Sequence, residues 1–190
     1  MYNHSVLGAA VLLAVFNAGF VQAQVVEAPR NNYFTADHSP SSYLKVLEAN
    51  HVNTFQARVS KGDMNLVWGD IIYTLDRFAN HPQGLQQLSQ MAQLLKRNAI
   101  AIKYFQMAVD LYPQNAITWV QYGMFLLAIN QVDDSIQKLQ QAVAVDAKFA
   151  PGHAALAHAY VRKKDVEHAR EAAMQARDLG FKGQLPAGLP

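Results

Sequence analysis

The histidines and paired carboxylates are the residues of this chain whose types could support metal binding or acid–base chemistry. Two metal ligands on one face of a helix need a spacing of three or four residues, which brings both side chains to the same side. His153 and His158 are five residues apart and point away from each other, and the chain has no HExxH motif. The pair Asp133-Asp134 falls at an expected helix start, where carboxylates stabilise the helix dipole. These patterns predict no catalytic residue, no metal site and no cofactor.

The overall composition excludes further classes of site. The chain has 190 residues, no cysteine and a formal net charge of +2. Without cysteine there is no disulfide, no thiolate metal site and no cysteine nucleophile. The charges are mixed along the chain, whereas nucleic-acid binders usually gather Lys and Arg on one face. We therefore expect no nucleic-acid partner.

An internal repeat with a period of about 34 residues supplies the elements that must position any binding residue. Small residues recur at three positions of the repeat, and large apolar residues recur at two others. The small ones are Ala108, Ala142 and Ala176; Ala101, Ser135 and Ala169; and Ser89, Gly123 and Ala157. The large ones are Leu88, Tyr122 and Leu156, and Leu111, Val145 and Leu179. Small residues let two helices approach closely, and large residues fill the grooves between neighbouring pairs. Such repeats must stack to bury their apolar faces.

This pattern resembles the tetratricopeptide repeat family, and residues 116–149 carry the resemblance most fully. The family's signature spacings are occupied by Trp119, Tyr122, Gly123, Leu126, Ser135, Leu139 and Ala142. The copy departs from the family at Ala147, where proline is usual. The resemblance implies an all-α fold, an α-solenoid of antiparallel helix pairs. Its expected units are 82–115, 116–149 and 150–183, with a tail at 184–190.

A degenerate helix pair is expected over 42–81, ahead of the three regular units. Its helices are predicted over 42–61 and 64–79, and Gly62-Asp63 stands at the position of the family's turn. Phe55 replaces the family's usual small residue. We therefore expect this pair to pack atypically, as terminal repeats do.

By the repeat register, the first helix of each pair lines a concave groove, and its outward positions are the candidate binding residues. Amide side chains can donate to and accept from a peptide backbone, and methionine adapts to irregular apolar side chains. We therefore predict that an extended or helical protein segment binds there. The alternative is that the glutamines are only a solvated helix surface. The predicted groove residues are Gln86, Gln90, Gln93, Val120, Gln121, Met124, His158 and Arg162.

The segment at 1–23 is interpreted as an export signal. Residues 6–21 carry no charge and are fewer than the roughly 20 that a membrane-spanning helix needs. Val21 and Ala23 suit the two positions that a signal peptidase inspects, which predicts cleavage after Ala23. The alternatives are an uncleaved membrane anchor and a buried N-terminal helix. A flexible lead-in is expected over 24–41.

These features predict a non-catalytic scaffold or adaptor that binds a protein partner in the bacterial cell envelope. The block at 69–78, followed by Asn80-His81-Pro82, is also similar to a lead-in segment of some exported bacterial tetratricopeptide proteins. The expected location is periplasmic or secreted. The first alternative is an accessory subunit of an envelope complex, attached to the inner membrane by a retained first segment. A further alternative is an enzyme or a carbohydrate-binding module.

Overall fold

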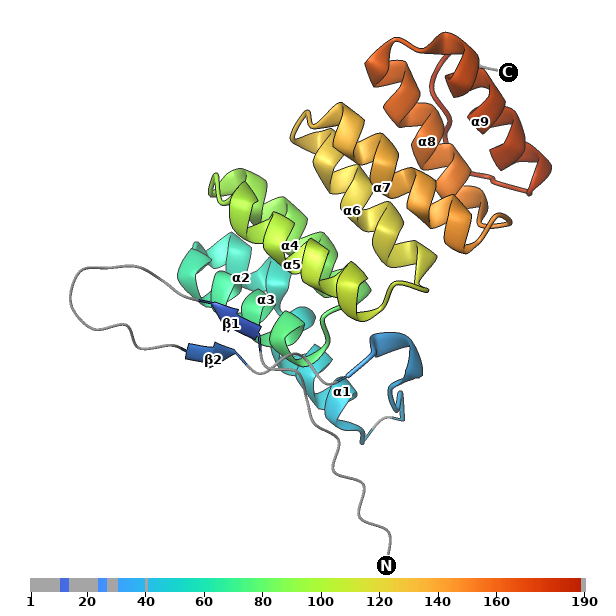
Figure 1. The fold of residues 1–190 in the computed structure, drawn as a ribbon. Helices are drawn as coiled ribbons and strands as arrows, with labels where there is room; N and C mark the ends of the chain where they lie inside the picture. Colours follow the sequence, from blue (N-terminus) through green and yellow to red (C-terminus); the bar gives the residue numbers. More distant parts are fainter. Residues whose placement is uncertain (1–10, 14–23, 27–30, 40, 189–190) are drawn as a thin grey trace, which may run out of the picture.

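The computed structural model describes residues 11–13, 24–26, 31–39 and 41–188, in which helix pairs follow one another along the chain (Figure 1). Three regular pairs form the array from residue 82 onward. The pairs are α4 (Pro82–Leu94) with α5 (Asn98–Leu111), α6 (Ala116–Ala128) with α7 (Val132–Val145), and α8 (Ala150–Lys163) with α9 (Val166–Asp178). Their first helices begin at Pro82, Ala116 and Ala150, and each start lies one repeat length after the one before. The α-solenoid of antiparallel helix pairs expected from the sequence is therefore confirmed.

The turn between the two helices of each pair has the same geometry in every copy. Its central residue has a left-handed backbone, with φ values of 80° at Gly62, 56° at Lys96, 65° at Asn130 and 65° at Lys164. The N–H of the next residue donates five residues back in each case, as from Arg97 to the Ala92 carbonyl at 2.7 Å. This bond closes the first helix in the manner of a Schellman motif. The four turns therefore share one register, which includes the leading pair.

The two helices of the middle pair make their closest approach at Gly123. A Cβ added there would lie 2.5 Å from Leu139 Cγ, so only glycine fits beneath that side chain. The Ser135 hydroxyl donates to the Gly123 carbonyl oxygen at 2.7 Å, which holds α7 against α6 at the same level. Leu139 itself is completely buried. A small residue on one helix thus accommodates a large one on the other, which is the packing that the repeat pattern indicates.

The apolar core of the array divides into two clusters at α6. One cluster runs from Phe55 to Leu126 and includes Phe105, whose ring stacks on Tyr122 at 5.4 Å between centroids. The other cluster begins at Leu127 and continues through the alanine-rich face of α9. Helix α6 therefore contributes one side to each cluster.

The leading pair differs from the two helices predicted over 42–61 and 64–79. Its first part is divided into α1 (Tyr43–Leu47), the π-helix η2 (Glu48–Val52) and α2 (Phe55–Lys61), and α3 (Met64–Arg77) follows. A π-helical turn holds an extra residue, so side chains after it face a different direction from those before it. Leu44, Leu47 and Val52 consequently pack on Phe78 in a small separate cluster, whereas Phe55 joins the main core. This turn explains how Phe55 occupies a position where the family has a small residue.

The flexible lead-in predicted over 24–41 differs from the structure in two places. Strand β2 (Gln24–Val26) pairs antiparallel with β1 (Val11–Leu13), and a 3-10 turn, η1 (Tyr33–Thr35), contacts the leading pair. The Tyr33 N–H donates to Asn80 Oδ1 at 2.9 Å, and Asn80 Nδ2 donates to Asn32 Oδ1 at 2.8 Å. Asn80 is completely buried, so these bonds satisfy an amide that has no access to water.

The export signal predicted over 1–23 lies largely outside the described residues, as does its predicted cleavage site after Ala23. Among the helices that the structure describes, none is both long and apolar enough to cross a membrane.

We predict that Gly123→Ala lowers the free energy of unfolding by about 1–3 kcal/mol, because the new Cβ overlaps Leu139. The same change made in a Leu139→Ala background should cost much less, since the overlapping side chain is gone. Urea denaturation of the two single variants and the double variant measures this coupling. Gly69→Ala is the control, because its Cβ would meet no atom within 4 Å, and it should not destabilise the fold. An equal cost of Gly123→Ala in both backgrounds would contradict the packing argument.

We also predict that Lys164→Gly raises the free energy of unfolding by about 0.5–1 kcal/mol. The left-handed backbone costs a residue that has a side chain roughly 1–2 kcal/mol, and glycine removes this cost. The greater freedom of glycine in the unfolded chain offsets part of the stability gained. Lys103→Gly, an exposed lysine within α5, is the matched control and should lower stability by about 1 kcal/mol. Thermal and urea unfolding of both variants distinguish the two positions, and a loss of stability in both would show that the turn is not strained.

Candidate peptide-binding groove

A shallow hollow between the leading pair and α4 contains two of the predicted groove residues. It has a volume of about 120 Å³, and Gln86 and Gln90 line it from α4. Three more amides, Asn53, Gln56 and Gln83, line it beside them. All five of these side chains are exposed. We call this set of five residues the amide hollow. Its lining is uncharged, so its chemistry is that of hydrogen bonds donated and accepted by neutral groups.

The floor of the amide hollow is fixed by a sixth amide. Gln87 is 5% exposed, and its Nε2 donates to the Val52 carbonyl oxygen at 2.8 Å. Val52 closes the π-helix η2, and this bond joins it to α4. Gln87 is therefore structural. The bond fixes the leading pair, which carries Asn53 and Gln56, to α4, which carries the other three exposed amides.

The remaining predicted groove residues do not join the amide hollow. Gln93 lies one turn beyond it on α4, and its Nε2 donates to the Ser89 carbonyl oxygen at 3.0 Å. Gln121 is engaged between two pairs, because its Nε2 donates to the Pro82 carbonyl oxygen at 2.7 Å. Val120 is half-buried against the second core cluster, and Met124 is 40% exposed on α6.

The two predicted residues on α8 are engaged at the far end of the array. His158 Nε2 donates to the Gln184 carbonyl oxygen at 3.2 Å. Arg162 Nη2 donates to Asn130 Oδ1 at 3.0 Å and joins the third pair to the turn of the second. Of the eight predicted residues, Gln86 and Gln90 lie in the amide hollow, and the other six lie elsewhere on the array.

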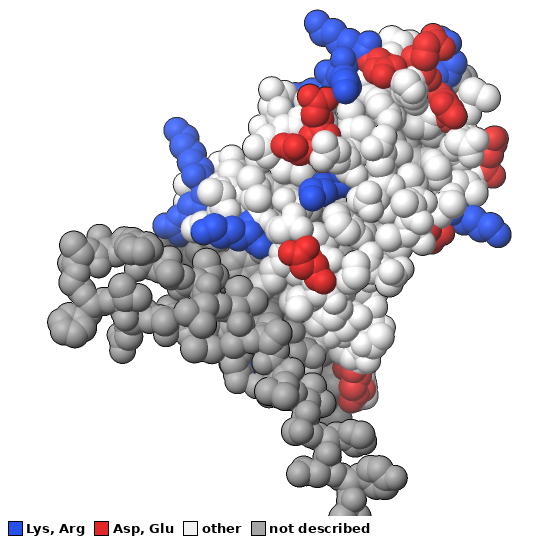
Figure 2. Space-filling model, viewed as in Figure 1, with Lys and Arg blue, Asp and Glu red and all other residues white. Residues whose placement is uncertain are grey.

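Charge is sparse over most of the array. On the face shown in Figure 2, charged side chains of both signs gather toward the α8–α9 end, and the middle of the array is mainly uncharged. A second hollow of about 440 Å³ is lined by Trp119 and by α7 side chains that include Lys138. Trp119 Nε1 donates to the Pro113 carbonyl oxygen at 2.8 Å, which assigns the indole a packing role.

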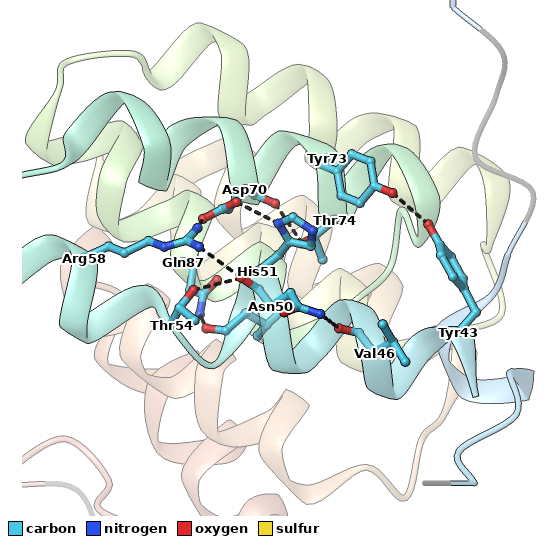
Figure 3. A network of polar contacts seen from close by, with 11 residues as sticks. Tyr43, Val46, Asn50, His51, Thr54, Arg58, Asp70, Tyr73, Thr74 and Gln87 are labelled. Atoms are coloured by element: carbon cyan, nitrogen blue, oxygen red, sulfur yellow. Dashed lines mark hydrogen bonds and ion pairs between the residues drawn. The ribbon is translucent and has the colours of Figure 1, made fainter. Parts of the chain in front are cut away.

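Sequence reasoning missed a buried polar network in the leading pair, which Figure 3 shows. Asp70 is 7% exposed and pairs with Arg58 through Oδ2 and with His51 Nδ1 through Oδ1 at 2.7 Å. We call these three residues the Asp70 network. Burial, followed by the neighbouring Arg58 charge, lowers the pKa of His51 below its ordinary value. The signal was present in the sequence as an acidic residue between the apolar Val67 and Ile71 of α3.

The hydroxyl groups drawn near the Asp70 network in Figure 3 form hydrogen bonds outside its side chains, and those of Tyr43 and Tyr73 bond to each other. The hydroxyls of Thr54 and Thr74 donate to the carbonyl oxygens of Asn50 and Asp70. Both hydroxyls are therefore used within the backbone of their own helices. The network links η2, α2 and α3, and its role is to fix the π-helical turn.

A second buried polar group lies where α3 leads into α4. His81 is 1% exposed, and its Nδ1 accepts the Gly84 N–H at 3.1 Å, which caps the start of α4. The other ring nitrogen, Nε2, then carries the proton and lies 3.4 Å from Glu48 Oε1. Burial lowers the pKa of His81 to about 4, although the Glu48 charge opposes the change. His81 is thus a neutral capping residue at pH 7.

Comparisons with known proteins agree with the fold of stacked helix pairs. No protein-family model matches the chain. Among curated proteins, the anaphase-promoting complex subunit cut9 of Schizosaccharomyces pombe is 27% identical over 78 residues. That match covers 41% of this chain and spans only 12% of the length of cut9.

Solved structures of MamA superpose on the array. The structure "MamA 41-end" from Desulfovibrio magneticus RS-1 has a TM-score of 0.52 at 20% identity and covers 75% of this chain and 86% of that chain. Another crystal structure of MamA has a TM-score of 0.52 at 16% identity, with coverage of 73% and 84%. The chain has a tetratricopeptide-type fold. At these identities the likeness to MamA is one of fold, and the side chains of the amide hollow belong to this chain's own sequence.

We predict that the free energy of unfolding falls by about 2 kcal/mol between pH 7 and pH 5 through His81. Its folded pKa is lowered, so the unfolded chain takes up a proton first as the pH falls from 6.5 toward 4. Urea denaturation across this range measures the slope, and His81→Asn, which keeps a capping side chain without a titrating ring, should reduce it. Protonation of His51 should lower the free energy of unfolding in the same direction in the wild type and in His81→Asn. An unchanged slope in His81→Asn would contradict the assignment.

Proposed function

We propose that the chain is a non-catalytic scaffold that binds an extended segment of a protein partner in the amide hollow. The observation that carries the proposal is the convergence of five exposed amides, from the leading pair and from α4, around one hollow. Amides can bond to both the N–H and the carbonyl groups of a peptide backbone, and every extended segment presents both. The fold supports this proposal, because stacked helix pairs create elongated binding surfaces.

The chemistry of the hollow favours a particular kind of partner segment. The five exposed amides carry no charge, so they offer no ion pair to an acidic or basic peptide. Such a lining recognises backbone groups and small polar side chains, and its affinity should depend little on salt. We therefore infer a neutral segment in an extended conformation.

We further propose that the scaffold acts in the bacterial cell envelope as an adaptor. The support is the uncharged run at 6–21, followed by Val21-Gln22-Ala23. The N-terminal sequence of the mature protein from its native source tests this proposal. A mature chain that begins at Gln24 supports export with release, and an intact first segment favours the anchored alternative.

The test of the amide hollow compares two pairs of glutamines. Gln86→Ala with Gln90→Ala removes two lining amides, whereas Gln114→Ala with Gln131→Ala removes two exposed amides from the turns before α6 and α7 and is the matched control. Each full-length protein is used as bait in native envelope extract, with quantitative mass spectrometry of the captured proteins. We expect the first pair to lose about tenfold of a specific partner and the control pair to retain it. Equal capture by both pairs would exclude the hollow as the binding site.

A further inference from the structure

The chain after α9 turns back and runs alongside α8 and α9 in Figure 1. We call residues 181–188 the C-terminal tail. The turn begins at Gly180, whose φ of 84° requires a left-handed backbone, and Phe181 N–H donates to the Ala176 carbonyl oxygen at 2.9 Å. The reversal is therefore built into the end of α9, and it directs the tail onto the third helix pair.

Two contacts hold the tail on that surface. The Gln184 carbonyl oxygen accepts from His158 Nε2 at 3.2 Å, and the Leu185 side chain packs against the second core cluster. Leu185 and Pro186 are both half-buried, whereas Lys182, Gly183 and Gln184 before them are exposed. One backbone carbonyl and one Leu-Pro pair thus make the contact.

The position of these contacts follows from the repeat. Gln184 lies one repeat length after Ala150, the first residue of α8, just as Ala150 lies one repeat length after Ala116. In the earlier pairs, the first helix of the next pair begins at this point and packs on the pair before it. In the described part of the chain, no helix begins at this point, and the tail runs there as a segment that has neither helix nor strand.

The sequence of the tail suits this role. Proline restricts the residue before it to an extended backbone, so Leu185 reaches the surface with little conformational freedom to lose. A carbonyl acceptor and an apolar side chain on neighbouring residues are features that an extended segment of any protein can present.

We propose that the surface of α8 and α9 around His158 is a binding slot for extended segments that contain Leu-Pro, and that the C-terminal tail is its resident occupant. The slot is separate from the amide hollow, which lies at the other end of the array. His158 supplies the hydrogen bond to the backbone, and the second core cluster supplies the apolar contact for leucine. Because one hydrogen bond and the Leu185-Pro186 pair hold residues 184–186 in the slot, an added segment of the same kind displaces them.

The experiment uses trypsin cleavage after Lys182, which is exposed beside the slot, as the readout of tail release. The full-length chain is digested briefly, and mass spectrometry measures the product that ends at Lys182. Leu185→Ser and His158→Ala should each speed this cleavage by about fivefold or more, because the tail leaves the slot. Ala187→Ser, in the exposed part of the tail, is the control for the first variant. His153→Ala is the control for the second, because the His153 ring bonds to the Ala147 carbonyl oxygen and not to a carbonyl of the tail.

A second arm tests the slot in the unaltered protein and so does not depend on a variant that must fold. The probe is a capped synthetic peptide with the sequence of residues 183–188, which trypsin does not cleave. Added in millimolar excess, it should speed cleavage after Lys182 in the wild-type chain, and a probe carrying Leu185→Ser should not. No acceleration by the wild-type probe, or equal acceleration by both probes, would overturn the proposal. If the cleavage after Lys182 slows as the protein concentration rises, the slot holds the tail of a second copy. That result would overturn the proposal that the chain's own tail occupies it.

Discussion

The approach of α6 to α7 at Gly123 sets the spacing on which the middle of the array depends. A glycine beneath Leu139 allows the two helices to pack closely enough for Ser135 to reach the Gly123 carbonyl oxygen. Because α6 contributes to both core clusters, its position relative to α7 also determines how the second pair meets the first and the third. The left-handed turn at Asn130 makes this arrangement possible, since it reverses the chain between Ala128 and Val132.

The leading pair shows how a buried charge can hold an irregular backbone. The π-helical turn at Glu48–Val52 would leave its last carbonyl without a helical partner, and Gln87 supplies the missing donor. The Asp70 network then fixes the turn from the other side through His51. Removal of one partner from such a group leaves an uncompensated buried charge, so the irregular segment and the network depend on each other. The amide hollow lies at this junction, and its shape follows from it.

The regular pairs could be predicted from the sequence because their determinants are local and repeated. The periodic recurrence of small residues located the helices, and Gly62 located the turn of the leading pair. The buried bonds of Asn80 could not be predicted in this way, since they join residues 47 and 48 positions apart and leave no periodic signal. The contacts of the predicted groove residues could not be foreseen for a related reason. Register places Gln121 on the correct helix face, but it does not reveal that the neighbouring pair brings the Pro82 carbonyl oxygen within reach.

The division of the core at α6 has a consequence for how the molecule loses its structure. In an array of stacked pairs, stability is approximately a sum of local terms and contacts between neighbours. Leu126 and Leu127 are adjacent in sequence but belong to different clusters, so the backbone of α6 is shared by two cooperative units. Opening of α8 and α9 exposes one side of α6 while its other side stays packed on Phe105 through the ring of Phe125. Amide hydrogens of α6 should therefore exchange with solvent more slowly than those of either end of the chain, and the terminal pairs can open separately without unfolding the whole.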